Sequence, residues 1–211
     1  MSSESTATRK RAYRKRRRAA LEMETRRRIT EAAVDLHGSV GPARTTIRAV
    51  AERAGVQRAT VYRHFPDEEA LFDACSSHWI GQHPLPDPAA WEAIDDPEER
   101  LRAALRELYA WYERGEYMLE KTTRDVELVP ALRPAMEAFG TWFEAATAAL
   151  VRGRPERGAR RRRVRGAIGH ALAFDTWRSL VHRQDLTTPE AVELMANFAA
   201  GAGEATSSRS T

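Results

Sequence analysis

The sequence has little of several residue types, and each shortage excludes a class of protein. Cys75 is the only cysteine in 211 residues, so no disulfide can form within the chain, as is usual in a reducing compartment. No apolar run approaches the roughly 18 residues that a membrane-spanning helix needs. The basic residues near the start are not followed by the apolar stretch of a secretory signal. We therefore expect a soluble, cytoplasmic protein with no membrane contact.

Motifs for catalysis and metal binding are also missing. The chain contains no GxSxG or HExxH motif, no glycine-rich phosphate loop and no zinc spacing of cysteine and histidine. His78 and His83 are five residues apart across Gly81, the wrong spacing for two ligands on one helix face. We therefore predict a protein that is not an enzyme and uses neither a cofactor nor a metal. An enzyme that processes small molecules remains a less favoured alternative.

Positive charge is concentrated at one end of the chain. Residues 1–28 contain eleven Lys or Arg and three Glu, whereas the remaining residues carry a net charge of −4. Within Arg9–Arg18 eight of ten residues are basic, which predicts a self-repelling arm that is disordered in the free protein. Near DNA such an arm can lie along phosphates or reach into a minor groove. The alternative is a solvated tail that only improves solubility.

Apolar residues recur at helical spacing along most of the chain, and no stretch shows the alternation typical of a strand. We therefore expect an all-α protein. The first helix is predicted to begin near Glu24 and to end at Gly38, and a loop rich in proline follows Gly81. The later helices are predicted at about 96–114, 116–128 (after an interruption at Gly115), 130–151, 159–182 and 188–200.

Residues 45–72 carry the most informative local pattern. Thr46 is a suitable N-cap, and Gly55 is suited to ending the helix because glycine enters the left-handed conformation without steric penalty. A second short helix follows, in which Val61 and Phe65 face inward. The helix that Thr46 caps presents one apolar stripe, formed by Ile47, Val50, Ala51 and Ala54.

The outer face of the second short helix is polar. Arginine can bond guanine, glutamine can bond adenine, and threonine offers a methyl group to thymine. This combination favours a helix-turn-helix whose second helix lies in a DNA major groove. An ordinary helical hairpin with a solvated face is the alternative. The outward residues are Gln57, Arg58, Thr60, Tyr62, Arg63 and His64.

Four consecutive pieces of the N-terminal third resemble one protein family. They are RRRITEAAVDLHGSVG, TTIRAVAERAGV, QRATVYRHF and PDEEALF. The run AGV followed by TVYRHF is highly specific, and residues 26–75 resemble the N-terminal domain of the TetR (tetracycline repressor) family of bacterial transcription regulators. The remainder resembles the family only in length and helical character. The resemblance implies a homodimeric repressor whose recognition helices read a palindromic operator and which a small-molecule effector releases from double-stranded DNA.

The resemblance and the polar face together define a predicted DNA-binding set. Thr46 and Arg48 are expected to contact the DNA backbone, and Gln57 and Arg58 are expected to read bases. Ala59 stands where relatives often carry glycine or proline, which leaves the tilt of the recognition helix open. The complete set is Thr46, Arg48, Gln57, Arg58, Ala59, Thr60, Tyr62, Arg63 and His64, of which Tyr62 and His64 are assigned to phosphate or thymine.

Aromatic residues concentrate between residues 109 and 177, as in small-molecule pockets. Packing in an ordinary helical core is the alternative for each of them. His170 and Asp175 are candidate polar anchors, although a core role is the commoner one for a histidine on an apolar face. The predicted effector-binding set is Trp111, Tyr112, Tyr117, Trp142, His170, Phe174 and Trp177.

The last two helices carry more apolar surface than an edge helix needs, which favours a two-fold dimer through both. The alternative is that their stripes pack internally; the second stripe contains Val192, Met195, Phe198 and Ala199. A DNA-packaging protein driven by the arm is a further alternative to the repressor. The predicted parts are a disordered basic arm (1–23), a helix-turn-helix DNA-binding domain with a linking helix (24–80), a loop (81–95), a helical ligand-binding and dimerisation domain (96–200) and a disordered tail (201–211).

Overall fold

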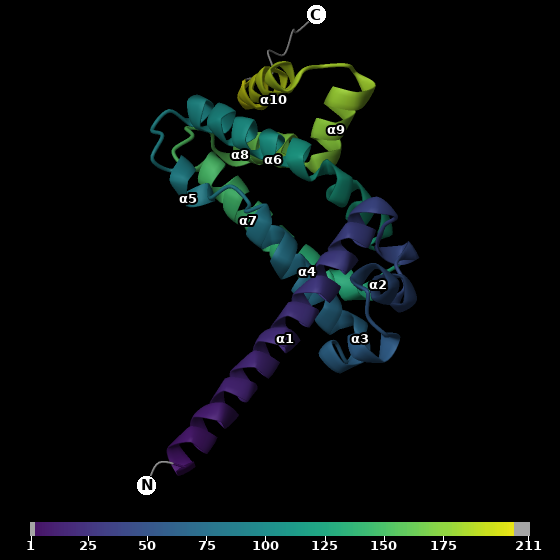
Figure 1. The fold of residues 1–211 in the computed structure, drawn as a ribbon. Helices are drawn as coiled ribbons and strands as arrows, with labels where there is room; N and C mark the ends of the chain where they lie inside the picture. The colour runs from purple at the N-terminus through teal and green to yellow at the C-terminus, as the bar shows by residue number, and fades with distance from the viewer. Residues whose placement is uncertain (1–2, 205–211) are drawn as a thin grey trace, which may run out of the picture. The chain divides into compact units, whose positions relative to one another are not determined.

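The computed structural model describes residues 3–204, and in this range every regular element is a helix (Figure 1). The predicted all-α fold is therefore confirmed. The chain forms two compact units, one from Met1–Gln82 with Tyr117–Arg133 (unit 1) and one from His83–Glu116 with Pro134–Thr211 (unit 2). No helix in the described range is long and apolar enough to cross a membrane.

Unit 1 is built around the first four helices. Helix α1 packs against α2 and α4, and α2 packs against α3. Their apolar faces form one core that includes Ile29, Val50, Val61, Phe65 and Leu71. The elements are α1 (Ser3–Ser39), η1 (Pro42–Arg44), α2 (Ile47–Ala54), α3 (Arg58–His64), α4 (Glu68–Gln82), the end of α6 (Pro97–Asp125) and η2 (Pro130–Leu132).

Helix α1 is longer than the sequence predicts. It begins at Ser3 rather than near Glu24, so the arm over residues 3–23 is helical and the expectation of a disordered arm is wrong for these residues. The physical reason is composition: arginine, alanine, leucine and glutamate are good helix formers, and no glycine or proline precedes Gly38. An i,i+4 ion pair between Arg18 and Glu22 adds to this preference.

Burial of His37 makes unit 1 sensitive to acid. The ring lies 4.6 Å from that of Phe72 in a stacked arrangement, and burial lowers its pKa from 6.5 to about 4. The unfolded chain therefore binds a proton at higher pH than the folded protein, so stability present above pH 6.5 is lost as the pH falls toward 4.

We expect the free energy of unfolding to decrease by up to about 3 kcal/mol across that interval because of His37 alone. Urea unfolding at a series of pH values measures the effect. His37→Gln should flatten the curve between pH 4 and 6.5. An unchanged slope in the variant would show that another group controls acid stability.

Unit 2 contains α5 (Pro88–Trp91), the start of α6, α7 (Arg133–Val151), α8 (Gly158–Leu172), α9 (Phe174–Arg183) and α10 (Thr188–Gly203). The predicted interruption at Gly115 and separate helix 116–128 are wrong, because α6 continues through a buried Gly115 to Asp125. Helix α10 runs past Ala200 to Gly203, and residues 205–211 of the predicted tail lie outside the described range.

The predicted helix 159–182 is divided at Ala173, which has an extended backbone. Two buried tyrosines stabilise the break, since the hydroxyl of Tyr109 donates to the carbonyl of Ala171 and that of Tyr112 to the carbonyl of Leu172. These bonds satisfy carbonyls at the end of α8 that would otherwise lack donors. The bonds join residues about sixty apart in sequence, so the break has no local signal.

The predicted domain limits differ from the two compact units. Residues 81–95 are not only loop, because α5 lies within them. Residues Tyr117–Arg133, predicted to belong to the C-terminal domain, are part of unit 1. The indole of Trp79, for example, donates to the hydroxyl of Tyr117 across 3.1 Å.

Candidate nucleic-acid interface

The turn between α2 and α3 has the geometry of a helix-turn-helix. The hydroxyl of Thr46 accepts a hydrogen bond from the backbone of Ala49 and caps α2. Gly55 has φ 64° and ψ 41°, the left-handed conformation that the sequence predicted. The N–H groups of Gly55 and Val56 then donate to the carbonyls of Glu52 and Ala51, closing a Schellman motif.

Helix α3 is held by two apolar side chains. Val61 and Phe65 are 0% and 1% exposed, so the predicted inward face is correct. Asp67 caps the following helix by accepting from the backbone of Ala70. These contacts fix the back of α3 and leave its polar side chains free to meet a partner.

The predicted contact residues of α3 occupy its outward face. Arg58, Ala59, Tyr62 and Arg63 are exposed, as is the N-cap residue Gln57, while Thr60 and His64 are partly buried. Within the described part of the chain, neither Arg58 nor Arg63 forms an ion pair, so both guanidinium groups are available to an anion. Arginine in the first turn of a recognition helix is well placed to reach base edges.

His64 is neutral rather than charged near neutral pH. Partial burial, with smaller contributions from Arg63 and Arg26, lowers the pKa of its ring. The Nε2 atom is buried and has no hydrogen-bond partner within the described residues. This placement favours a role in packing or hydrogen bonding at the end of α3 over a charge contact.

Thr46 and Arg48, the two residues predicted to contact the DNA backbone, differ in the bonds that they already form within the protein. Thr46 uses its oxygen as the cap acceptor, but its hydroxyl proton can still be donated to a phosphate. Arg48 is exposed and forms a 2.8 Å ion pair with Glu52 one turn later. Exposed pairs of this kind contribute little stability, so exchange of Glu52 for phosphate is inexpensive.

Two arginines of α1, Arg26 and Arg28, position the helix-turn-helix; the sequence showed them only as part of the N-terminal positive charge. Arg26 donates to the carbonyl of His64 at 2.5 Å, and its guanidinium lies 4.0 Å from the centre of the Phe65 ring. Arg28 donates to the carbonyl of Ala54, at the end of α2. Both bonds satisfy carbonyls at helix C-termini and complement the helix dipoles.

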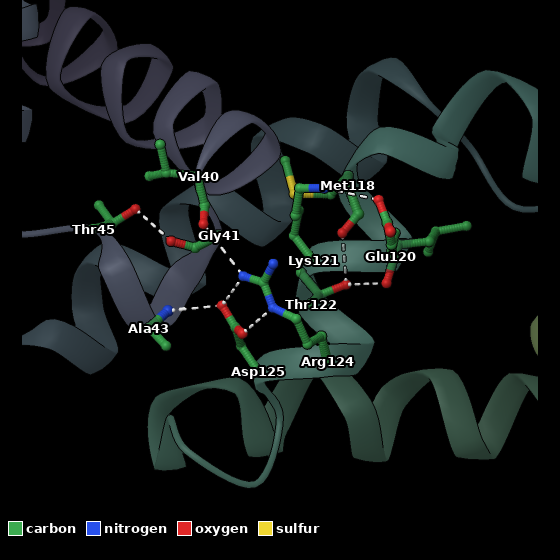
Figure 2. Close-up of polar contacts among 11 residues, drawn as sticks. Val40, Gly41, Ala43, Thr45, Met118, Glu120, Lys121, Thr122, Arg124 and Asp125 are labelled. Atoms are coloured by element: carbon green, nitrogen blue, oxygen red, sulfur yellow. Dashed lines mark hydrogen bonds and ion pairs between the residues drawn. The ribbon is translucent and has the colours of Figure 1, made fainter.

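A second contact set links the end of α6 to the segment before α2 (Figure 2). The buried carboxylate of Asp125 accepts from the backbone of Ala43 at 3.0 Å and from Arg124 at 2.7 and 3.0 Å. Arg124 also donates to the carbonyl of Val40. We call Arg124 and Asp125 the α6 clamp.

The clamp requires glycine at position 41. Gly41 has φ 97°, and a Cβ atom there would lie 2.2 Å from a guanidinium nitrogen of Arg124 and 2.5 Å from the carboxylate of Asp125. The clamp therefore fixes the η1 turn that leads into Thr46. Bonds with a sequence separation above eighty gave no recognisable signal in the sequence.

The predicted effector-binding aromatics mostly form a packed cluster in unit 2. Trp111, Tyr112 and Trp177 are buried, and the Tyr112 ring contacts those of Trp111, Phe174 and Trp177. Trp142 is partly buried and donates to the carbonyl of Pro86. Neither the cavity lined by η1, α2 and α4 nor the surface hollow at Pro155–Arg160 contains any of these residues.

Two members of the predicted effector set lie elsewhere. Tyr117 is 46% exposed and belongs to unit 1. His170 was expected on an interior face but is exposed on α8, where it contacts the Thr176 hydroxyl and the ring of Phe198. Neither residue joins the cluster around Tyr112, and Asp175 is likewise exposed.

The fold is shared with solved structures at low sequence identity. A candidate fatty acid metabolism regulator from Clostridium perfringens superposes with a TM-score of 0.61 at 16% identity, covering 82% of this chain and 97% of that one. A candidate TetR-family transcriptional regulator from Mesorhizobium loti MAFF303099 gives 0.58 at 20%, covering 86% and 96%. A TetR-like transcriptional regulator from Rhodococcus sp. RHA1 gives 0.57 at 18%, covering 85% and 97%.

Sequence comparison identifies the N-terminal region. Curated protein sequences give no match to the chain. Residues 29–75, which contain the end of α1, the helix-turn-helix and the start of α4, match the model of bacterial regulatory proteins of the tetR family. A family of regulators supports the prediction of a regulator over that of an enzyme. Residues 29–75 of this chain are therefore similar to bacterial regulatory proteins of the tetR family.

Proposed function

We propose that this DNA-binding regulator is a homodimeric repressor that reads a palindromic operator and is released from it by a small molecule. The observation that carries the proposal is α3 itself. Val61 and Phe65 anchor its back, whereas Arg58, Tyr62 and Arg63 are exposed on its front. A helix held in this way can enter a major groove without rearrangement of the unit that carries it.

Base readout is assigned to the start of α3. Arg58 is the first residue of the helix and Gln57 is its N-cap. Arginine recognises guanine through two parallel hydrogen bonds, and glutamine recognises adenine in the same way. Tyr62 and Arg63, further along the helix, are assigned to DNA phosphates. Thr46 and Arg48 are assigned to phosphates of the neighbouring part of the DNA backbone.

A single helix-turn-helix makes few base contacts, so the proposal needs a second copy. Val192, Met195 and Ala199 of the predicted dimer stripe are buried within the chain, where α10 packs on α8, and the internal-packing alternative holds for them. Leu194 and Phe198 stay 46% and 50% exposed, one turn apart on α10. A two-fold axis beside this pair would bury both side chains against their copies.

Phe198→Glu is expected to convert the dimer to a monomer and to lower operator affinity, because a carboxylate would be buried against its own copy. Sedimentation velocity measures the oligomeric state, and titration of an operator duplex gives the number of chains bound. Ile80→Glu, at an apolar side chain 39% exposed in unit 1, is the matched control. A variant that still sediments as a dimer would place the interface elsewhere.

The effector is assigned to the aromatic cluster of α6 and α9. Trp177 supports this choice, because its indole nitrogen is buried without a hydrogen-bond partner among the described residues, and such a donor is costly to leave unpaired. We propose that an acceptor group of the effector binds it. A compound that shifts tryptophan fluorescence and lowers operator affinity in the wild type, but does neither in Trp177→Phe, would identify the site; equal responses would exclude Trp177.

A further inference from the structure

The N-terminal part of α1 lies before Arg26, the residue of this helix that is hydrogen-bonded to the end of α3. We call residues 9–25 the arm helix. Figure 1 shows it, in purple, as a straight continuation of α1 that extends beyond α2, α3 and α4. At about 1.5 Å per residue its 17 residues span roughly 25 Å. Its described side chains are exposed, with Thr25 partly buried.

The arm helix starts next to the recognition helix. Arg26 is bonded to the carbonyl of His64 at the last residue of α3, and Ile29 and Ala33 bury the following turns of α1 in the core of unit 1. Because no glycine or proline interrupts α1 between residues 9 and 29, these anchors also fix the direction of the arm helix. The arm helix therefore begins beside the end of α3, the element proposed to read the operator.

The charge of the arm helix is almost uncompensated. Of its described basic side chains only Arg18 forms an ion pair, with Glu22, and this arginine is 84% exposed. Like charges at this density repel one another along a helix, so a polyanion is the partner that stabilises the helical form. The exposed basic side chains are Arg9, Arg11, Arg14, Lys15, Arg16, Arg17 and Arg18.

The helical form determines which part of DNA the arm can contact. A helix with side chains is about 10–12 Å across, whereas the minor groove of B-DNA is about 6 Å wide and the major groove about 12 Å. The minor-groove contact expected of a disordered arm therefore does not suit this element. We propose that the arm helix binds the phosphates bordering the major groove next to the half-site read by α3. This inference rests on the proposed DNA-binding function.

Two full-length variants separate the charge of the arm from its rigidity. Replacing Arg14, Lys15, Arg16 and Arg17 by Gln removes four charges and preserves helix propensity. Ala19→Pro with Ala20→Gly keeps every charge but breaks the helix between the arm and its anchors. Operator affinity is measured against salt on a short duplex limited to the two half-sites and on a longer duplex with flanks. Hydroxyl-radical footprinting maps the protected backbone.

On the long duplex the glutamine variant should reduce the log–log salt slope by about 0.9 for each phosphate that the arm no longer neutralises, a total of roughly 2–4. Protection of the flanks should disappear in both variants. The selected motif should stay the same, and the affinity for the short duplex should change less than about threefold. An unchanged slope with the glutamine variant would overturn the proposal. Flank protection that survives in the proline variant and is displaced by a minor-groove ligand would show a flexible arm and overturn the helical contact.

Failure of the proposed function has a different signature. If the wild-type protein selects no motif while the glutamine variant still has a reduced salt slope on any duplex, the repressor proposal fails and the phosphate contact of the arm stands. If the wild-type protein selects a motif and the arm variants match it on both duplexes, only the arm proposal fails.

Discussion

Replacing Arg58 by alanine is expected to weaken binding to the selected operator by about 1–3 kcal/mol, or roughly 5- to 150-fold. The reason is geometric. Arg58 opens α3, is exposed, and forms no ion pair within the described residues, so its guanidinium is free to bond one guanine through two hydrogen bonds. Specificity should relax at one position in each half-site and stay unchanged elsewhere.

The measurement is competition binding with operators mutated one base pair at a time. Arg53→Ala is a matched control, because Arg53 lies on α2 and faces Asp35 of α1 at 3.5 Å. The control should leave base preferences unaltered. If Arg58→Ala weakens binding equally on every sequence, Arg58 contacts phosphate and base readout lies with other residues of α3.

Replacing Asp125 by alanine is expected to lower the free energy of unfolding of unit 1 by about 2–3 kcal/mol. The change leaves the backbone N–H of Ala43 without its acceptor and removes both bonds to Arg124. Arg124 is 44% exposed, so water can hydrate its guanidinium once the carboxylate is removed. The expected loss of stability is therefore well below that for breaking a fully buried ion pair. Operator affinity should fall too, because the clamp fixes the turn before Thr46.

Urea unfolding and operator titration measure the two effects separately. Asp35→Asn is the control, since Asp35 is an exposed carboxylate of α1 in a weak pair with Arg53. Hydrogen bonds from Arg124 and from Ala43 lower the pKa of Asp125, so its stabilisation should be present above the ordinary carboxyl pKa and lost in acid. Wild-type stability in Asp125→Ala would show that the clamp does not hold η1.

Local chemistry explains what could be predicted from the sequence. Thr46 as a cap, Gly55 as a left-handed stop, and Val61 with Phe65 as the buried side are all set by residues within a few positions of one another. Such features can be predicted because the groups that form hydrogen bonds with a helix end are usually close to it in the sequence. The all-α fold followed from the same apolar periodicity.

Contacts between distant residues explain what could not be predicted. The bond from Arg26 to His64, the α6 clamp and the tyrosine bonds that hold the break at Ala173 join residues 38 to 84 positions apart. In the sequence Arg26 was only one more basic residue. The helical arm could not be predicted for another reason: charge repulsion within Arg9–Arg18 and the helix propensity of the same residues favour opposite outcomes, and propensity prevails.

The most direct test of the repressor proposal is selection of bound duplexes from a random DNA pool by the purified protein at physiological salt. We expect a palindrome whose two half-sites are separated by about one helical turn or a multiple of it. Recovery of no motif, with binding that collapses as salt rises, would contradict the repressor proposal. It would indicate instead a packaging protein bound through the charge of its arm.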